Sequence, residues 1–256
     1  MMADLRFFLN HIDPSSGKVV FPPDIAHQIV HVLRLQPGDQ VTVLDGEGRA
    51  YQVCLNPFDE SLSAEILRIG ESPVRVPLQM ALFFPLSKRD RVEWILQKCT
   101  EVGVAAFHPF ISERSLVQEI ELPPKKAARW ESIIREAAEQ SGRAVLPVLH
   151  HPQRLSEIVT AGLSAYALDT ALVALVGQGV QPLAIRLNEI LKNDSDPSLG
   201  LFIGTEGGFS EQELAQFKAA SFSLVSLGDT VLRMETAAIV FPALVLYGYS
   251  NRRLSE

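Results

Sequence analysis

The feature that most constrains the fold is a regular alternation of apolar runs and amphipathic stretches after residue 77. The run LQMALFF at 78–84 is continuously apolar, and the following segment SKRDRVEWILQKCTEVG at 87–103 has apolar residues at helical spacing. Further strands are expected at AAFHPFI, VLPVLH, SAYALD, LGLFI and FSLVSL. Further helices are expected at KKAARWESIIREAAEQSG and beginning near Arg154, Gln181, Glu211 and Thr236. Six strands alternating with helices predict an α/β fold with a mostly parallel sheet covered on both faces.

Two of these helices carry clear buried stripes. In 87–103, Ser87 is expected to cap the helix together with Asp90, and Gly103 is expected to end it. The apolar positions predicted to face the core in the two helices are Val92, Ile95, Leu96, Cys99 and Val102, then Trp130, Ile134, Ala137 and Ala138.

The first 72 residues have a different pattern, in which short apolar runs are separated by turn residues. Short strands are expected at LRFFLN, KVVF and QVTVLDGEGRAYQVCL, where Asp45-Gly46 and Glu47-Gly48 provide hairpin turn chemistry. One helix, DIAHQIVHVLRL, interrupts them, with Asp24 as the expected cap and an apolar face formed by Ile25, Ile29, Val32 and Leu33. The proline-containing stretch ESPVRVP at 71–77 is typical of a linker. We therefore expect a small β-barrel-like domain at 1–72 and an α/β domain at 73–256.

The composition excludes several classes of protein. With 47% hydrophobic and 21% charged residues, the 256-residue chain resembles an average globular protein. No apolar run is long enough for a membrane span, and the first residues do not read as a secretory leader. Cys54 and Cys99 are far apart and are expected to be reduced thiols, so the cytoplasm is the expected location. The net charge of −7 argues against a generally basic nucleic-acid binder, although residues 73–145 are locally basic.

The stretch LFIGTEGGFSEQEL at 201–214 joins a strand to a helix through a glycine-rich turn. It matches neither common phosphate loop, Ser210 and Glu213 form a predicted capping box, and Glu206 would repel an anion. The glycines allow a flat ligand to approach the backbone closely. A flat, phosphate-free and cationic ligand fits these conditions, and S-adenosylmethionine is such a molecule. A tight turn without a ligand is the alternative.

A second loop follows the next strand. Residues 228–236, GDTVLRMET, place an arginine, a glutamate and a threonine just before the apolar helix AAIVFPALVLY. Ligands of parallel sheets bind beyond the carboxyl ends of the strands, so the two loops are expected to share one site. The alternative is a surface loop in which Glu235 or Thr236 only caps the last helix.

These two segments carry a family resemblance. LFIGTEGGFSEQE and LGDTVLRMETAA resemble the signature segments of the ribosomal RNA small-subunit methyltransferase E family, in the SPOUT class of RNA methyltransferases. Further matching stretches run through nearly the whole chain in order, including RDR at 89–91, QKCTEVG at 97–103 and EAAEQSGR at 136–143. Two positions depart from the family pattern. Thr205 stands where proline is more common, which suggests a looser loop, and Pro242 suggests a kinked last helix.

The resemblance implies a fold and an activity. The implied fold is a SPOUT-type domain with a C-terminal trefoil knot, preceded by a PUA-like β-barrel that helps to bind RNA. The implied reaction transfers a methyl group from S-adenosylmethionine to N3 of one uridine near the 3′ end of 16S rRNA in the small ribosomal subunit. The implied assembly is a homodimer.

The two loops supply the candidate site residues. Arg233 is expected to stabilise negative charge on the uracil or to clamp a phosphate, and Glu235 is expected to take the N3 proton or to hold Arg233. An internal Arg233–Glu235 ion pair that only stiffens the loop is the alternative. The expected cofactor-binding residues are Ile203, Gly204, Thr205, Glu206, Gly207, Gly208, Leu227, Gly228, Leu232, Arg233, Thr236 and Ala237.

The RNA contacts are expected among polar residues of the matched segments. Each basic one is also compatible with a solvated surface charge, and Ser141 with Gly142 is compatible with a simple helix end. The expected contacts are Arg6, Arg34, Lys88, Arg89, Arg91, Arg114, Gln140, Ser141 and Arg143.

Two other functions, an oxidoreductase and a non-catalytic RNA-binding protein, have less support in the sequence. A nicotinamide-dependent oxidoreductase would need a GxGxxG motif after its first strand, and that position reads LFFPLSKRD. A non-catalytic RNA-binding protein would retain the fold without turnover. His27 and His31 have the spacing of metal ligands on a helix, but no acidic or thiol residues complete the set, so no metal is predicted.

Overall fold

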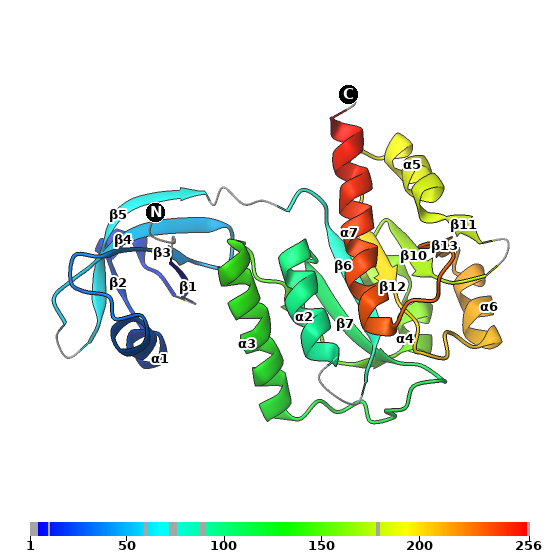
Figure 1. The fold of residues 1–256 in the computed structure, drawn as a ribbon, viewed down its shortest axis with the longest axis horizontal. Helices are drawn as coiled ribbons and strands as arrows, with labels where there is room; N and C mark the ends of the chain where they lie inside the picture. The colour runs from blue at the N-terminus through cyan, green and yellow to red at the C-terminus, as the bar shows by residue number, and fades with distance from the viewer. Residues whose placement is uncertain are drawn as a thin grey trace. The chain divides into compact units, whose positions relative to one another are not determined.

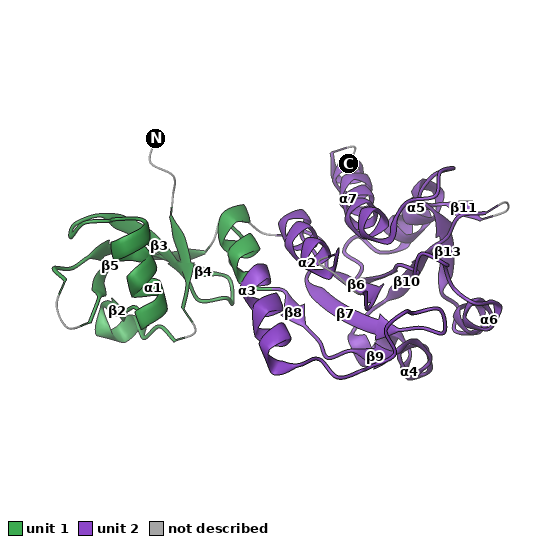
Figure 2. Cartoon of the chain, turned by 60° about the horizontal axis from the view of Figure 1, so that its bottom comes forward, with its two compact units in different colours: residues 1–75, 135–146 green, residues 76–134, 147–256 purple. Residues whose placement is uncertain are grey.

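The computed structural model describes residues 5–9, 11–58, 61–71, 76–87, 91–177 and 180–254. The chain divides into two compact units (Figure 2). Unit 1 comprises residues 1–75 and 135–146, and unit 2 comprises residues 76–134 and 147–256. The predicted linker at 71–77 and the predicted cap formed by Ser87 and Asp90 fall largely outside the described residues.

Unit 1 contains a five-stranded sheet in the order β1-β3-β4-β5-β2. The strands β1 and β3 pair in parallel, and the remaining neighbours are antiparallel. The predicted hairpin joins β3 to β4, and the Asp45 carboxylate accepts from the N–H of Glu47 at 2.8 Å. Strand β5 was not anticipated from the sequence. The strands are β1 (Arg6–Phe8), β2 (Lys18–Val20), β3 (Gln40–Leu44), β4 (Arg49–Leu55) and β5 (Ser63–Glu71).

The helix of unit 1 departs from the prediction at both ends. Helix α1 (Pro23–His27) begins with a proline, so Asp24 lies inside the first turn and does not cap it. The helix continues as a π-helical turn over Gln28–Val32, in which the N–H of Leu33 bonds the carbonyl of Gln28 at 2.9 Å. The wider turn rotates the following side chains. Val32 is therefore exposed, contrary to prediction, whereas Ile29 is buried as predicted.

Unit 2 is built on an eight-stranded sheet, and its described strand pairs are all parallel. The main order is β11-β13-β10-β12-β6-β7-β8, and β9 also pairs with β7. This confirms the predicted mostly parallel α/β fold. The strands are β6 (Met80–Pro85), β7 (Ala106–Ile111), β8 (Val148–Leu149), β9 (Gln153–Arg154), β10 (Thr170–Ala174), β11 (Gln181–Pro182), β12 (Leu199–Phe202) and β13 (Ser223–Ser226).

Helices cover both faces of this sheet (Figure 1). Alternate side chains of β6 face opposite cores: Leu82 packs with the α2, α5 and α7 side, and Phe83 packs with the α4 and α6 side. Trp130 and Ile134, in the part of α3 that belongs to unit 2, are buried in the first of these cores. The helices are α2 (Arg91–Val102), α3 (Pro124–Ser141), α4 (Leu155–Ala161), α5 (Leu183–Asn193), α6 (Glu211–Ala219) and α7 (Met234–Arg253).

One predicted strand is wrong. The segment SAYALD does not form a strand: Leu163–Tyr166 is a 3-10 helix, and Ala167 has a left-handed backbone with φ of 53°. The strand is β10, which begins at Thr170 and places Leu172 and Val173 in the buried interior. Burial of the continuous run ALV outweighs the alternating pattern of the preceding residues.

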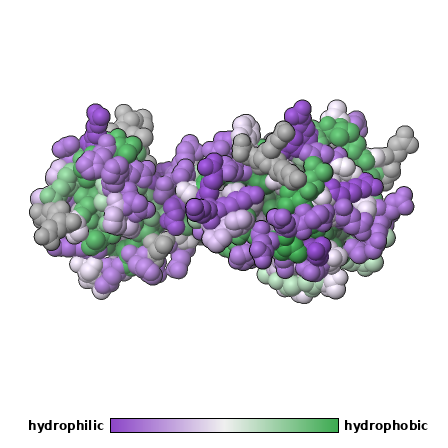
Figure 3. Space-filling view, turned by 90° about the horizontal axis from the view of Figure 1, so that it is seen from below, coloured by the Kyte–Doolittle hydropathy of each residue, from purple (hydrophilic) through white to green (hydrophobic). Residues whose placement is uncertain are grey.

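The predicted end of α2 is confirmed. Gly103 ends α2 with φ of +119°, and its N–H bonds the carbonyl of Cys99 at 3.0 Å. In the view of Figure 3, hydrophilic side chains cover most of the surface, with hydrophobic side chains in smaller groups between them. Within the described part of the chain, no helix has the length and apolar character that a membrane crossing requires.

Candidate active site

The two loops singled out in the sequence follow β12 and β13, the strands on either side of β10. In the sheet order, β10 lies between β12 and β13, and all three run in parallel. Their carboxyl ends therefore meet at one edge. The loop after β12, residues 203–210, is called the cofactor loop below. The loop after β13, residues 227–233, leads directly into α7.

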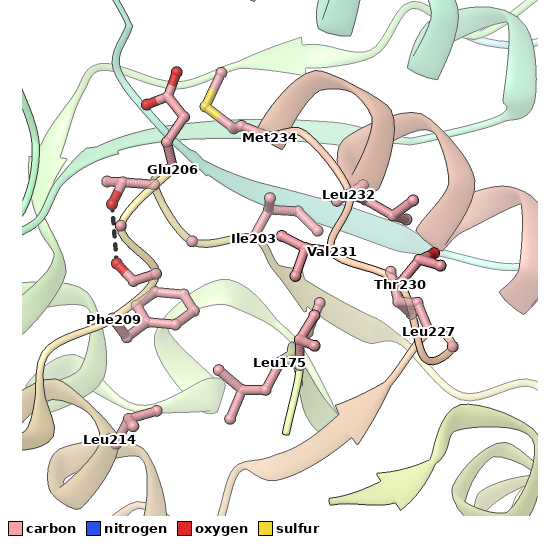
Figure 4. Close-up of a pocket in the computed structure, with 18 residues that line it drawn as sticks. Leu175, Ile203, Glu206, Phe209, Leu214, Leu227, Thr230, Val231, Leu232 and Met234 are labelled. Atoms are coloured by element: carbon pink, nitrogen blue, oxygen red, sulfur yellow. Dashed lines mark hydrogen bonds between the residues drawn. The ribbon is translucent and has the colours of Figure 1, made fainter. Parts of the chain in front are cut away.

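The cofactor loop is a closed turn held by its own atoms. The N–H of Gly208 bonds the carbonyl of Thr205 at 2.8 Å, and the Thr205 hydroxyl donates to the carbonyl of Gly208 at 2.9 Å (Figure 4). Gly204 lies so close to this turn that an added Cβ would be 3.2 Å from the Cα of Gly208. The Thr205 side chain thus adds a hydrogen bond across the turn.

The far end of the cofactor loop is fixed by the predicted capping box. The Ser210 hydroxyl accepts from the N–H of Glu213 at 3.1 Å, and the Glu213 carboxylate accepts from the N–H of Ser210 at 2.8 Å. Glu213 is buried, and its second oxygen accepts from the N–H of Glu113 at 2.9 Å. The carboxylate thus joins the cofactor loop to the loop after β7, and the N-terminus of α6 is satisfied by protein groups.

A cavity of about 370 Å³ lies between the two loops and the end of β10. Its size is within the range of about 300–1,000 Å³ that is typical of small-molecule sites. Glu206 is the charged residue among its lining side chains, and apolar side chains such as Leu175 and Phe209 dominate the wall (Figure 4). The lining residues are Ala174–Val176, Ile203–Phe209, Leu214, Leu227, Gly228, Thr230–Leu232, Met234 and Ala237.

Most of the predicted cofactor-binding residues line this cavity. Arg233 and Thr236 are the exceptions. The segment Ala174–Val176 also lines the cavity but was not predicted to do so, because the preceding strand was expected too early in the chain. The signal that would have found it is the apolar run at 171–176, which continues directly into the strand-end loop.

The two candidate catalytic residues have different surroundings. Arg233 is exposed at the N-cap of α7. The Glu235 side chain is 19% exposed, and its Oε1 lies 4.0 Å from Nε of Arg91. Its Oε2 is buried and has no hydrogen-bond partner among the described residues. The ion pair recorded for Glu235 in the described part of the chain is thus with Arg91, and not the internal pair with Arg233 that the sequence left open.

Two of the predicted RNA-binding arginines contact the cofactor loop. The guanidinium of Arg91, at the start of α2, donates to the carboxylate of Glu206. The guanidinium of Arg114, in the loop after β7, donates to the carbonyl of Gly207 at 2.5 Å. Both side chains thus hold the outer surface of the cofactor loop, which the sequence did not indicate.

The other predicted RNA contacts are scattered. Arg6 begins β1, and Arg34 is exposed with a left-handed backbone (φ of 55°). Lys88 and Arg89 lie outside the described residues. His27 and His31 have ring centroids 4.8 Å apart, and the described residues contain no group of three or more His, Cys, Asp or Glu that could hold a metal ion.

The end of α3 belongs to unit 1 and has mixed exposure. Gln140 is exposed, whereas the Ser141 hydroxyl donates back to the carbonyl of Ala137 at 2.7 Å. Gly142 ends the helix with φ of 76°, as in the helix-end alternative. Arg143 is only 4% exposed, and burial lowers its pKa to about 10. Arg143 is therefore not the solvated surface charge that the sequence left open as an alternative.

Comparison with known proteins gives the family. Residues 74–246 match the model of an RNA methyltransferase domain, and residues 21–57 match an RNA methyltransferase PUA domain. The ribosomal RNA small subunit methyltransferase E of Synechocystis sp. is 34% identical over 84% of this chain and 68% of that protein. The chain belongs to the ribosomal RNA small subunit methyltransferase E family.

Other members agree with this assignment. The Bacillus subtilis member is 29% identical over 86% of each chain. A crystal structure of the Neisseria gonorrhoeae member bound to S-adenosyl methionine matches with a TM-score of 0.82 and 31% identity, over 95% of this chain and 97% of that chain. A methyltransferase structure from Legionella pneumophila, also in complex with this cofactor, matches with a TM-score of 0.83 and 27% identity, over 96% of this chain and 98% of that chain. The mostly parallel α/β fold and the PUA domain expected from the sequence are thereby confirmed.

Proposed function

We propose that this protein transfers a methyl group from S-adenosylmethionine to N3 of one uridine near the 3′ end of 16S rRNA in the small ribosomal subunit. The observation that carries the proposal is the cavity between the two family signature loops, in a chain of the methyltransferase E family. The structural relatives from Neisseria gonorrhoeae and Legionella pneumophila bind this cofactor.

The cavity suits S-adenosylmethionine in shape and charge. Apolar side chains such as Leu175, Phe209 and Leu227 offer a surface for the flat adenine ring. No lysine or arginine lines the cavity, so it offers no cation to a phosphate group, and the charged residue in its lining is the acidic Glu206. Backbone groups of the cofactor loop are exposed to the ligand because Gly204, Gly207 and Gly208 have no side chains. Arg233 and Thr236, outside the cavity wall, remain proposed cofactor contacts from the family pattern.

The reaction needs a base and a stabilising cation. S-adenosylmethionine supplies an electrophilic methyl group on sulfur. As the bond from N3 to this methyl forms and the bond to sulfur breaks, the N3 proton must leave the uracil. Glu235, in the first turn of α7, takes this proton, because one of its carboxylate oxygens accepts no hydrogen bond from the described residues. The exposed Arg233 guanidinium, two residues away, stabilises the negative charge that develops on the uracil oxygens.

The assembly and the domain roles are part of this proposal. Residues 1–72 act as a PUA-like RNA-binding domain and residues 73–256 as the methyltransferase domain, which carries the C-terminal trefoil knot of the SPOUT class and forms a homodimer in the cytoplasm. The match of residues 21–57 to a PUA domain of RNA methyltransferases supports the first assignment. The placement of β10, β12 and β13 side by side, with both signature loops at one edge, supports the second.

The test is direct. The purified protein is incubated with methyl-labelled S-adenosylmethionine and small ribosomal subunits from cells that lack the modification, and the labelled nucleoside is identified after digestion. We expect label in 3-methyluridine, and its loss in Glu235→Gln and Arg233→Ala. Removal of a general base lowers rates by about 10²–10⁴-fold. Label in another nucleoside would refute the N3 assignment, and cofactor binding without any transfer would favour a non-catalytic RNA-binding protein.

A further inference from the structure

Arg91 lies between two carboxylates that come from different loops of the site. Its guanidinium donates through NH1 to Oε1 of Glu206 on the cofactor loop, and its Nε lies 4.0 Å from Oε1 of Glu235 in the first turn of α7. A guanidinium carries five N–H donors in a fixed plane, so one arginine can bind two carboxylates at the same time. A lysine, as a compact point charge, reproduces this arrangement only in part.

The backbone that carries Arg91 is firmly held. Arg91 is the first residue of α2, and the next turn contributes the buried side chains Val92 and Ile95 to the core. The helix packs directly on α7, where the Cys99 thiol donates to the carbonyl of Ala238 at 3.2 Å. The guanidinium is therefore presented from a rigid element, whereas both of its partners belong to the loop or the helix start that borders the cavity.

The pairing leaves Glu235 incompletely satisfied. Its Oε1 faces Arg91, but Oε2 is buried without a hydrogen-bond partner in the described structure. An unsatisfied buried acceptor costs free energy. Buried polar atoms without partners are uncommon in native proteins and need an explanation, of which a catalytic role is one. Arg91 thus contacts one carboxylate oxygen of Glu235, and the other oxygen is free of hydrogen bonds from the described residues.

Glu206 connects this pair to the cofactor. It lines the cavity, and its carboxylate points away from the apolar side chains Phe209 and Leu214 (Figure 4). The cofactor loop and the proposed base are thus joined through a single side chain.

We propose that Arg91 is a positioning residue that joins Glu206 of the cofactor loop to Glu235 and orients this carboxylate toward the reacting nucleotide. The inference rests on the proposed function and adds a residue to it. It also assigns Arg91 a role other than the RNA phosphate contact expected from the sequence.

The test is a double-mutant cycle in methyl transfer. Single-turnover rates with saturating cofactor and RNA are measured for Arg91→Gln, Glu235→Gln and the double variant. Residues that act through one another give non-additive effects. We expect Arg91→Gln to lower the rate by at least about fivefold in the wild-type background and to change it little in the Glu235→Gln background. Arg91→Lys is expected to recover part of the rate.

The control is an ion pair of the same kind between α3 and α2. Arg129 donates to the carboxylate of Glu93 at 2.6 Å, and neither residue lines the cavity. Arg129→Gln is expected to leave the single-turnover rate unchanged. Thermal unfolding of each variant shows whether the fold is retained. A rate loss for Arg91→Gln that is the same in both backgrounds, or a rise in KM for RNA with kcat unchanged, would overturn the inference in favour of an RNA contact.

The cofactor affinity provides a readout that does not need activity. Binding of S-adenosylmethionine is measured by calorimetry for Arg91→Gln, Glu206→Gln and the double variant. We expect both single changes to alter the affinity and the double change to add little to the larger one. Independent, additive effects would contradict a link through Glu206. If the wild-type protein binds the cofactor but methylates no RNA, the proposed function fails, and this cycle still decides whether Arg91 holds the cofactor loop.

Discussion

The thiol of Cys99 in α2 donates a hydrogen bond to the backbone carbonyl of Ala238 in α7, with 3.2 Å between sulfur and oxygen. In a regular helix this carbonyl would accept from the N–H four residues later, but that residue is Pro242, which has no N–H. The neighbouring helix thus supplies the donor that the proline removes. Helix α7 is continuous from Met234 to Arg253 across this position, so Pro242 does not end it.

This relationship predicts a coupling between Cys99 and Pro242. Cys99→Ala leaves a buried carbonyl without a donor and is expected to lower the free energy of unfolding by about 1–3 kcal/mol. Pro242→Ala restores the backbone donor, so in that background Cys99→Ala should cost about 1 kcal/mol less. Cys99→Ser, which keeps a hydroxyl donor, serves as the conservative control. Urea unfolding measures all of these variants, and an equal cost of Cys99→Ala in both backgrounds would contradict the coupling.

His108 predicts an acid sensitivity of folding. The ring is buried between the stacked rings of Phe83 and His150, with centroids 4.4 and 4.0 Å away. Burial, with a smaller contribution from His150, lowers the pKa of His108 to about 3. The folded state thus holds the neutral ring, while the unfolded state takes up a proton below about pH 6.5. Stability is therefore complete above pH 6.5 and is lost as the pH falls toward 3, by up to about 1.4 kcal/mol per pH unit.

The check uses a variant that cannot titrate. His108→Phe keeps an aromatic ring in the stack and removes the proton uptake. The free energy of unfolding is measured in urea at pH 7.5, 6.5 and 5.5 for both proteins. We expect the wild type to lose more stability over this range than His108→Phe does. Parallel pH dependences would show that His108 is not the responsible group.

Glu139 gives the opposite pH dependence in unit 1. Its Oε1 accepts from the N–H of Phe8 in β1 at 2.9 Å. Burial raises the pKa of Glu139, although the bond from Phe8 and the charge of Arg135 act in the other direction. The folded state therefore favours the protonated acid, and this contribution is fully present below the unfolded pKa of about 4.3 and is lost as the pH rises through the folded value.

Replacement of Glu139 by glutamine separates the hydrogen bond from the charge. Glu139→Gln keeps an oxygen for the Phe8 N–H and is expected to be at least as stable as the wild type at pH 7. Glu139→Leu loses the acceptor and is expected to be less stable by about 1–3 kcal/mol. As the pH falls from 7 to about 4, the wild type should gain stability relative to Glu139→Gln. Unfolding curves at pH 7 and pH 4 test this, and a large loss for Glu139→Gln at pH 7 would disprove it.

The cofactor loop leaves little room for a side chain at Gly204. A Cβ at this position would lie 3.2 Å from the Cα of Gly208 and from the ring of Phe209, so the turn must move. Such overpacking costs about 1–3 kcal/mol of folding stability. Gly204→Ala should therefore lower the free energy of unfolding, and it should weaken S-adenosylmethionine binding because the displaced turn lines the cavity. Gly70→Ala is the matched control, because an added Cβ there meets nothing within 4 Å. Equal affinities of the two variants in calorimetry would exclude a tight turn as the cause.

Much of the fold and part of the site follow from local sequence patterns. The buried stripe of α2, its end at Gly103 and the capping box of Ser210 and Glu213 depend on residues a few positions apart. All are confirmed except Val102 of the stripe, which is only partly buried. The cofactor loop was recognised because its glycines and Glu206 exclude a phosphate ligand. Local patterns misplaced the strand at SAYALD and the exposure of Val32, where a left-handed residue and a π-helical turn changed the direction of side chains.

What the sequence by itself determined is the α/β class, the two kinds of region along the chain and the two loops that bear the site, because each depends on spacing over a few residues. Only the tertiary structure decided which residues of the site contact one another. It brought Arg91 between Glu206 and Glu235, which are 115 and 144 positions away, placed Arg114 on Gly207 and set Cys99 against Ala238. Such contacts depend on the order of parallel strands in the sheet and on how helices pack across it. Residue spacing along one chain does not contain this information.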